Sequence, residues 1–317
     1  MMLNGVILDL DTLYPEDLDL SPLLDNPQVE WCVHGRSKPE DIVARIRDAD
    51  LVLTNKAPVM AEQMAAATGL RYIGVLATGT NVIDMAEAKR REIVVTRIVN
   101  YGTPAIVQHV FALILALTTK LPAYAAAVND GGWSASEDFC LLGFPVRELD
   151  GLTMGIIGYG TLGQAVAAVA RAFGMRVVVA QLPGWQPQAK DVERELFADF
   201  LRMSDIVTIH CPLQDNTRRL ISAPEFALMR DDALLINCAR GEIVDSQALA
   251  RALKEGVIGG AGLDVLDQEP PPADHILLDG AVPNLIITPH CAWGAREARQ
   301  RLVEIAAVNL QNWLHQA

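Results

Sequence analysis

Three ionisable side chains, Arg240, Glu269 and His290, each follow a short apolar stretch in the second half of the chain. The stretches have the length and composition of buried strands in a parallel sheet. They are residues 234–239, 260–265 and 286–289. In open α/β sheets the ligand binds at the carboxyl ends of the strands. We therefore expect the three side chains to lie in one site.

An arginine, a carboxylate and a histidine at three strand ends suit the reduction of a 2-oxo acid. Arg240 would hold the substrate carboxylate and polarise the oxo group, because its planar guanidinium matches two acceptors. His290 would protonate the oxo oxygen while a nicotinamide supplies hydride. Glu269 would bond the other imidazole nitrogen, fix the tautomer and favour the protonated ring. Taken singly, each residue also fits an ordinary structural role, so the prediction depends on their joint placement.

A glycine-rich turn, Gly-Tyr-Gly-Thr-Leu-Gly, occupies residues 158–163. It follows an apolar run that is typical of a strand and precedes an alanine-rich run that is typical of a helix. This order predicts a cradle for the phosphates of a dinucleotide. Gly158 permits the tight turn, Gly160 lets the backbone approach a pyrophosphate, and Gly163 lets the helix pack on the strand. The start of the helix then offers unpaired N–H groups to the anion.

The composition excludes several classes of function. The chain has 317 residues, which is long enough for two domains, and 51% of them are hydrophobic. The net charge is −13 and the isoelectric point is about 4.9. This acidic balance argues against binding to nucleic acid or to an anionic membrane surface. We interpret the acidic surface as a source of solubility.

The cysteines and the apolar segments predict a soluble, cytoplasmic protein. The five cysteines are scattered and include no CxxC pair, which is typical of free thiols in a reducing compartment. The N-terminus lacks the cationic region of a signal peptide. The most hydrophobic run, residues 110–117, is far shorter than the roughly 20 residues that span a bilayer.

Strand-like and helix-like runs alternate along the chain, which predicts parallel sheets covered on both faces. In the first hundred residues the expected strands are 6–10, 29–33, 51–55, 72–77 and 93–97, with helices at 39–49, 61–67 and 83–91. In the second half the expected strands are 153–157, 176–180, 206–211, 233–238, 260–265 and 285–288. The helices between them are 162–173, 195–203, 223–229 and 245–255. No glycine cradle follows the first strand of the chain.

Two further segments connect the halves. A long apolar helix is expected over 104–121, with Thr103 as its N-cap and Pro104 at its first position. It is apolar on nearly every face, which predicts burial between layers. Residues 122–150 show no clear period and are expected to form an irregular arm. A last helix over 296–314 is expected to return to the first domain.

The predicted fold class is α/β, with two doubly wound parallel-sheet domains and an active-site cleft between them. A substrate-binding, flavodoxin-like domain would comprise residues 1–100 and 291–317. A dinucleotide-binding Rossmann domain would comprise residues 101–290.

Four motifs stand in a fixed order along the chain. They are Gly158-Tyr-Gly-Thr-Leu-Gly163, Asn237-Cys-Ala-Arg-Gly241, Gly262-Leu-Asp-Val265 with Glu269-Pro270, and Pro289-His290. Their order and spacing, over essentially the whole chain, resemble the D-isomer-specific 2-hydroxyacid dehydrogenase family. The resemblance implies that the arginine, glutamate and histidine singled out above are the catalytic set.

The resemblance also implies binding roles for other residues. The loop of Ala77, Thr78, Gly79 and Thr80 would hold the substrate carboxylate with its backbone amides. Coenzyme contacts would come from Thr103, Gly158, Gly160, Thr161, Leu162, Gly163, Gln181, His210, Cys211, Pro212, Cys238 and Asp264. Among these, Asp264 would bond the nicotinamide carboxamide, and the His210-Cys-Pro212 run would line the coenzyme groove. We predict no metal ion among the cofactors.

Several segments are most similar to the glycerate dehydrogenase, or hydroxypyruvate reductase, branch of the family. They are Trp133, Phe139-Cys-Leu-Leu142, Arg147-Glu-Leu149 and Trp293. Trp293 would narrow the pocket beside the histidine toward a small substrate, or it would pack at a domain interface. The family also implies a homodimer joined through the arm at 104–150, although the apolar helix there could equally be internal core.

Two positions depart from the family pattern. Gln181 stands where dinucleotide sites usually place an Asp or Glu that bonds the ribose 2′-hydroxyl. A neutral amide does not repel a 2′-phosphate, yet residues 182–186 offer no arginine or lysine to attract one. This favours NAD weakly and leaves NADP open. Gln108 replaces a glutamate that many relatives carry, and we have no mechanistic account of it.

The leading prediction is NAD(P)H-dependent reduction of a small 2-oxo acid, hydroxypyruvate or glyoxylate. A D-lactate-type dehydrogenase and a formate- or phosphite-oxidising relative remain alternatives within the family. From another class, the same fold also serves as a dinucleotide-sensing corepressor. The complete arginine, glutamate and histidine set counts against that alternative.

Overall fold

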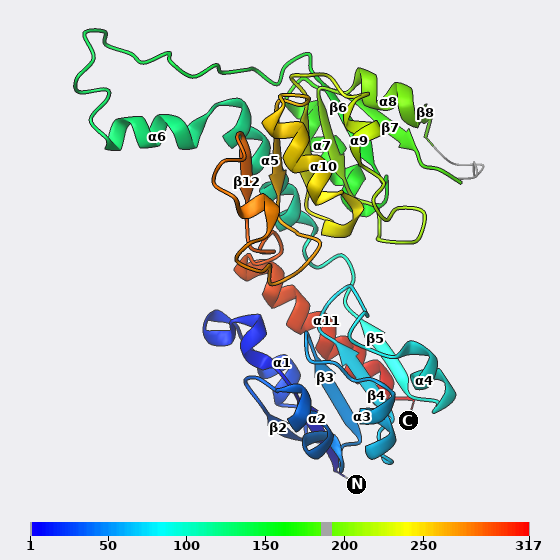
Figure 1. Ribbon diagram of the computed structural model, residues 1–317. Helices are drawn as coiled ribbons and strands as arrows, with labels where there is room; N and C mark the ends of the chain where they lie inside the picture. The colour runs from blue at the N-terminus through cyan, green and yellow to red at the C-terminus, as the bar shows by residue number, and fades with distance from the viewer. Residues whose placement is uncertain (1, 185–191, 317) are drawn as a thin grey trace. The chain divides into compact units, whose positions relative to one another are not determined.

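The computed structural model describes residues 2–184 and 192–316 (Figure 1). Contacts within the chain divide it into two compact units. Unit 1 comprises residues 1–102 and 293–317, and unit 2 comprises residues 103–292. Each unit is a parallel sheet with helices on both faces, so the predicted α/β fold class with two doubly wound sheets is confirmed.

Unit 1 contains a five-stranded sheet with the order β2-β1-β3-β4-β5, and all of its paired strands are parallel. This is the strand order of the flavodoxin-like doubly wound fold. The strands are β1 (Leu3–Ile7), β2 (Val29–Val33), β3 (Leu51–Thr54), β4 (Tyr72–Val75) and β5 (Val94–Arg97). β3 and β4 are buried along their whole length, as central strands covered on both faces should be.

Helices cover the two faces of this sheet with separate apolar cores. One core packs α2 (Pro39–Ile46), α3 (Ala61–Ala66) and α4 (Met85–Arg90) against the sheet. The other packs α1 (Ser21–Leu24) and the last helix, α11 (Arg296–Leu314), which lies in unit 1. Two short 3-10 helices, η1 (Leu10–Leu13) and η2 (Pro15–Asp17), precede α1.

Unit 2 contains a seven-stranded sheet with the order β12-β11-β10-β9-β6-β7-β8. Its first strand, β6, lies between β9 and β7, and the coenzyme-binding order of a Rossmann sheet is present with one added edge strand. The strands are β6 (Thr153–Ile157), β7 (Arg176–Gln181), β8 (Glu195–Leu196), β9 (Ile206–Ile209), β10 (Leu234–Asn237), β11 (Gly260–Leu263) and β12 (Leu285–Ile287). Six of these were expected, and the two-residue β8 is too short to leave a periodic signal.

The helices of unit 2 divide between the two faces of the sheet. On one face α5 (Thr103–Thr118) and α7 (Thr161–Ala172) form a core with β6, β9 and β10. On the other face lie α8 (Phe197–Met203), α9 (Ala223–Phe226) and α10 (Ser246–Lys254). Two 3-10 helices, η3 (Gly241–Ile243) and η4 (Ile276–Leu278), lie in the loops after β10 and β11. The predicted burial of the apolar helix α5 is confirmed.

The prediction of an irregular arm over 122–150 is wrong in its first part. Residues Leu121–Asn129 form α6, and only the segment after it is irregular. Pro122 occupies the first turn, where its missing N–H costs nothing, and three consecutive alanines follow at 125–127. In Figure 1 this helix and the loop after it extend away from the body of unit 2. Among the described residues no single helix is long and apolar enough to cross a membrane, although α5 and α6 pass that test as a pair bent by 61°.

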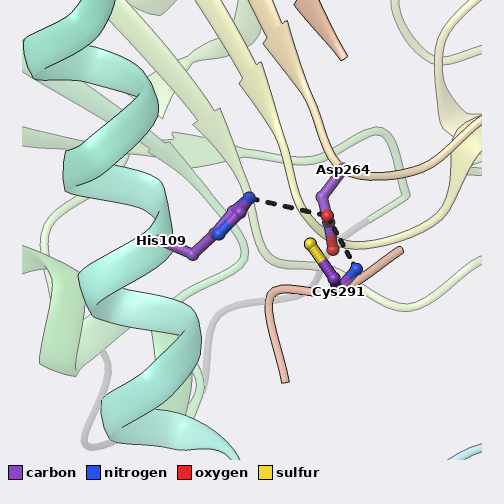
Figure 2. A group of neighbouring side chains, drawn as sticks. All are labelled: His109, Asp264 and Cys291. Atoms are coloured by element: carbon purple, nitrogen blue, oxygen red, sulfur yellow. Dashed lines mark hydrogen bonds and ion pairs between the residues drawn. The ribbon is translucent and has the colours of Figure 1, made fainter. Parts of the chain in front are cut away.

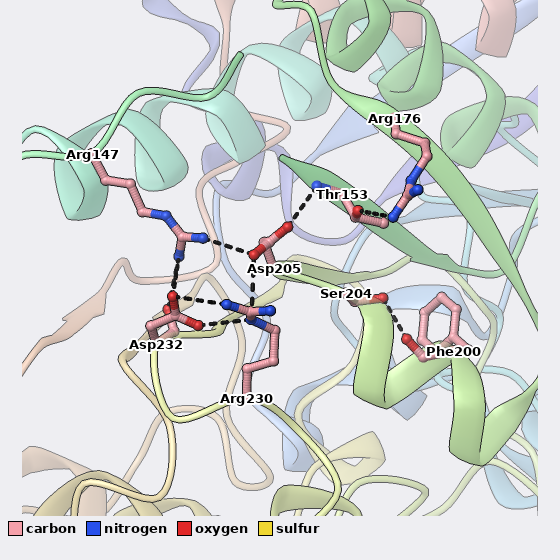
Figure 3. Close-up of polar contacts among 8 residues, drawn as sticks. All are labelled: Arg147, Thr153, Arg176, Phe200, Ser204, Asp205, Arg230 and Asp232. Carbon is pink, nitrogen blue, oxygen red and sulfur yellow. Dashed lines mark hydrogen bonds and ion pairs between the residues drawn. The ribbon is translucent and has the colours of Figure 1, made fainter. Parts of the chain in front are cut away.

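The end of the arm is fastened to the amino-terminal edge of the unit 2 sheet by an ion-pair network (Figure 3). Arg147 reaches Asp205 at 2.7 Å and Asp232 at 3.1 Å. The second carboxylate oxygen of Asp205 accepts the Thr153 N–H at 2.8 Å, where β6 begins. Arg230 pairs with both aspartates. The network therefore fixes the start of β6, at the edge of the sheet opposite to the glycine turn.

Candidate active site

The glycine turn joins β6 to α7 as predicted. Gly158 has a φ of +93°, a conformation that side chains with a Cβ rarely adopt. A Cβ there would also lie 2.5 Å from the backbone nitrogen of Cys211. At Gly163 a Cβ would lie 2.1 Å from the Gly158 carbonyl oxygen, so only glycine allows α7 to start this close to the strand.

The second glycine of the motif, Gly160, faces open space. A Cβ at Gly160 would meet no atom within 4 Å, and α7 begins at the next residue, Thr161, followed by Leu162. The helix start therefore presents its N–H groups toward open space, which suits a pyrophosphate. These residues fit the dinucleotide that the sequence predicted.

His210, Cys211 and Pro212 directly follow β9, which pairs with β6. The His210 Nε2 lies 2.9 Å from the Thr208 hydroxyl, while its buried Nδ1 has no hydrogen-bond partner in the described part of the chain. Burial of the ring lowers the pKa of His210 to about 3, and burial raises the pKa of Cys211 to about 11. Both side chains are thus uncharged at neutral pH, as suits a groove for the planar rings of a coenzyme.

Three other predicted coenzyme residues lie at element ends in unit 2. Thr103 begins α5, and the partly exposed Gln181 ends β7. Cys238 follows β10 and is buried, and burial together with the nearby Asp264 carboxylate raises its thiol pKa. No hydrogen bond among the described residues uses the Gln181 side chain for a structural purpose, so its amide remains available to a ligand.

Arg240 is positioned by the residue that ends β10. Asn237 is fully buried, and its side chain donates to the Arg240 carbonyl oxygen at 2.9 Å and accepts from the Ala239 N–H at 2.9 Å. The Arg240 guanidinium donates to the Ala239 carbonyl oxygen at 2.6 Å. The loop that carries the arginine is therefore fixed from beneath by an amide side chain.

Glu269 and His290 form a pair. The His290 Nδ1 and the Glu269 Oε2 are 2.5 Å apart, and the other carboxylate oxygen accepts the Leu266 N–H at 2.9 Å. Burial opposes ionisation of Glu269, but its bonds to His290 and Leu266 and the charge of Arg240 outweigh it and lower its pKa. The carboxylate is therefore ionised at neutral pH, and its negative charge lies against the Nδ1 of the imidazole.

The backbone of His290 is held in an uncommon conformation. Its φ is 53°, in the left-handed region, which costs a residue other than glycine about 1–3 kcal/mol. Asp264, which is 1% exposed, offsets this cost. Its carbonyl oxygen accepts the His290 N–H at 2.8 Å, and its carboxylate accepts the N–H groups of Cys291 at 2.9 Å and Ala292 at 2.8 Å. The aspartate thus anchors the segment that carries the histidine.

The predicted substrate residues lie in unit 1. Ala77 to Thr80 form the loop after β4, with the Thr78 hydroxyl donating to the Ile98 carbonyl oxygen at 2.7 Å. Within the described residues, no acceptor is found for the amides of Thr78, Gly79 or Thr80. Trp293 lies in the same unit, with its ring edge-on to Tyr101 at a centroid distance of 6.4 Å.

The sequence interpretation missed two positioning residues. One is Asn237, described above, which begins the family motif that ends at Gly241 but was given no role of its own. The other is Gly241, where a Cβ would lie 1.9 Å from the Leu266 carbonyl carbon. This contact lets the loop of Arg240 pack against the loop of Glu269. Gly241 ends the same family motif, but the motif does not show its role, because the contact joins two separate loops.

Comparison with known proteins agrees with this arrangement. The family model of the D-isomer specific 2-hydroxyacid dehydrogenase NAD-binding domain matches residues 111–292. A glycerate dehydrogenase of Methylorubrum extorquens is 42% identical over 273 residues, which cover 86% of this chain and 85% of that protein. A hydroxypyruvate reductase of Blautia hydrogenotrophica is 38% identical over 315 residues, with coverage of 98% and 96%.

A solved structure gives the same result for the fold. The TT0316 protein from Thermus thermophilus matches with a TM-score of 0.87 at 34% identity, covering 99% of this chain and 97% of that one. The resemblance predicted from the four motifs, including its glycerate dehydrogenase branch, is confirmed. The chain therefore belongs to the D-isomer specific 2-hydroxyacid dehydrogenase family, and it is an oxidoreductase that uses a nicotinamide dinucleotide to interconvert 2-oxo acids and D-2-hydroxy acids.

Proposed function

We propose that the protein reduces hydroxypyruvate or glyoxylate to the D-2-hydroxy acid, reversibly and with NADH as the weakly preferred coenzyme. The observation that carries the proposal is the Glu269–His290 pair, 2.5 Å apart and close to the charge of Arg240. Relatives named glycerate dehydrogenase and hydroxypyruvate reductase support the choice of a small substrate.

In this proposal His290 is the proton donor. Its Nδ1 is held by Glu269, so Nε2 is the nitrogen that delivers the proton to the oxo oxygen of the substrate. The ionised glutamate bonds Nδ1, which orients the ring and fixes the tautomer that remains after the transfer. When bound, the reduced nicotinamide supplies the hydride that adds to the substrate carbon.

Arg240 and the loop at 77–80 are the proposed substrate ligands. The guanidinium would bond the substrate carboxylate and polarise the oxo group, while the loop amides would bond the carboxylate. The open amides of that loop support this role. We accordingly propose residues 1–100 and 291–317 as the substrate-binding domain, with Trp293 limiting substrate size, and residues 101–290 as the coenzyme domain.

The first experiment is a spectrophotometric panel of hydroxypyruvate, glyoxylate and pyruvate, each with NADH and with NADPH. Fast oxidation of the coenzyme with hydroxypyruvate or glyoxylate, reduced by orders of magnitude in His290→Gln while NADH still binds, is the expected result. Pyruvate as the best substrate would favour a D-lactate-type dehydrogenase. Formate and phosphite are assayed separately with NAD⁺, and activity with either of them alone would favour those relatives. NADH binding without any turnover would favour a corepressor.

We also propose that the protein forms a homodimer through the segment 104–150, in which α6 and the loop after it would make the contact. Large apolar side chains are exposed there in the single chain, with Phe139 91% and Leu142 83% exposed. Contiguous exposed apolar surface marks sites of protein association. Light scattering after gel filtration should give twice the chain mass, and a Phe139→Ser/Leu142→Ser variant should give the single-chain mass. A monomeric parent protein would refute the proposal.

The cytoplasm is the proposed location, because all five cysteines are free. Free thiols persist in reducing compartments.

A further inference from the structure

Three side chains from different elements of unit 2 converge at one point (Figure 2). His109 comes from α5, Asp264 follows β11 and Cys291 follows β12. One nitrogen, one carboxylate oxygen and the sulfur of this cluster all lie within 4.8 Å of one another. The residues are far apart in the sequence, and no motif there signals the cluster.

The three ligand types are those that bind zinc. Zn²⁺ is held at about 2.0–2.3 Å by histidine nitrogen, carboxylate oxygen and cysteine sulfur in tetrahedral geometry, which places ligand atoms about 3.3–3.7 Å apart. The His109 Nε2 and the Asp264 Oδ1 are already 3.5 Å apart. The sulfur therefore has to make the main adjustment, and it belongs to an exposed residue.

The other two ligands are held in place. The Asp264 carboxylate is fixed by the N–H groups of Cys291 and Ala292 and by the Thr288 hydroxyl, which donates to it at 2.6 Å. The His109 Nε2 lies 2.8 Å from the same hydroxyl. An arriving ion would replace that contact of His109 and one of the two hydrogen bonds that the Asp264 Oδ1 accepts, from Thr288 and from the Cys291 N–H.

A zinc ion would displace the thiol proton of Cys291 when it binds, and it would neutralise the Asp264 carboxylate beside it.

We propose that His109, Asp264 and Cys291 bind one Zn²⁺, and that bound zinc excludes the coenzyme. Water would complete the tetrahedral coordination. The exclusion of the coenzyme depends on the proposed function, in which Asp264 bonds the nicotinamide carboxamide, whereas zinc binding itself does not. The ion takes the same carboxylate, so zinc acts as a reversible inhibitor that competes with NADH.

Zinc binding is tested without coenzyme or substrate. Metal-free protein in a phosphine reductant is titrated with Zn²⁺ against a chromophoric chelator. We expect one ion per chain and at least tenfold weaker binding in Cys291→Ser and in His109→Gln. Cys32→Ser is the matched control, because Cys32 is an exposed thiol 3.5 Å from the His34 Nε2 in unit 1. Undiminished binding in Cys291→Ser, or its loss in Cys32→Ser, would overturn the site.

A spectroscopic measurement on the parent protein tests the cysteine ligand without any variant, so it does not require that the variants fold. Co²⁺ added to the parent protein should produce the near-ultraviolet charge-transfer band of a cobalt–thiolate bond, and stoichiometric Zn²⁺ should abolish it. A Co²⁺ complex without that band would exclude the cysteine as a ligand and overturn the proposal.

Competition separates this inference from the proposed function. Saturating NADH should weaken zinc binding at least tenfold, and zinc should raise the KM for NADH in the parent enzyme but not in Cys291→Ser. Zinc binding that NADH leaves unchanged would refute the exclusion. A protein without reductase activity that still binds zinc through these residues would disprove the proposed function alone, whereas an active enzyme without zinc binding would disprove the site alone.

Discussion

Replacing Glu269 by glutamine isolates the role of its negative charge. Glutamine retains the shape of the side chain, and its amide oxygen can still accept the Leu266 N–H that holds the loop at 2.9 Å. What is lost is the charge-assisted bond to the His290 Nδ1 at 2.5 Å. The perturbation therefore reaches the imidazole while leaving the loop anchored.

The expected magnitude follows from the strength of that bond. A hydrogen bond to a charged group contributes about 1.5–3 kcal/mol, or about 10- to 150-fold in rate. The side chains of His290 and Glu269 are 32% and 34% exposed, and solvent screening weakens ionic interactions at such sites. We therefore expect kcat/KM for reduction to fall by the lower part of this range, about 10- to 40-fold at neutral pH.

The assay is steady-state reduction of hydroxypyruvate across pH, together with NADH affinity from fluorescence titration. The difference between the two proteins should shrink as pH falls through the lowered pKa of Glu269, because the parent side chain then loses its charge as well. NADH affinity should stay within about twofold of the parent value, since no contact in the glycine turn changes. Glu269→Ala, which also loses the Leu266 bond, should be slower than Glu269→Gln.

Two results would contradict this reasoning. An unchanged rate in Glu269→Gln would show that the carboxylate does not assist proton transfer. A loss of equal size at every pH, accompanied by weaker NADH binding, would show that the residue acts through the shape of the site and not through its charge.

Three further substitutions test other parts of the structure. Gly241→Ala places a Cβ 1.9 Å from the Leu266 backbone, so kcat should fall at least tenfold with NADH affinity kept, and parent-like kcat would refute the packing argument. Gln181→Asp should weaken NADPH more than NADH in paired KM measurements, and equal effects would place the ribose elsewhere. Asp245→Asn should lower the free energy of unfolding by about 1 kcal/mol at pH 7. Burial raises the pKa of Asp245, but the bonds from Arg219 and from the first amides of α10 outweigh burial, so the net pKa is lowered. Since that contribution is lost as pH falls through the lowered pKa, urea titrations of the two proteins should converge in acid, and a constant gap would exclude the charge as its source.

Much of the fold is decided locally, which is why the sequence predicts it. Nearly every expected strand and helix is present. Their ends differ from the expected ones by a few residues, because the hydrogen bonds between strands end before the apolar stretches of sequence do. The exceptions are also local in origin. The two-residue β8 is shorter than any period, and α6 depends on an alanine-rich stretch whose helical preference outweighs its lack of an apolar stripe.

The candidate site divides in the same way. Residue types and spacing predict the glycine turn and the positions of Arg240, Glu269 and His290 after their strands. Both depend on the local sequence, because a tight turn needs glycine and a strand ends where its apolar stretch ends. That Glu269 bonds His290 and that Arg240 lies close to Glu269 depends on strands β10, β11 and β12 being neighbours in the sheet.

Only the tertiary structure decided the contacts between separate segments. Gly241 is required by the backbone of Leu266, and Asp264 anchors the segment of His290 by accepting its N–H groups. His109 meets Asp264 and Cys291 because α5 packs against the strands of unit 2. Local patterns report only the secondary structure in which a residue lies. Which residues meet across a sheet is fixed by strand order and helix packing, and these depend on the free energy of the whole core.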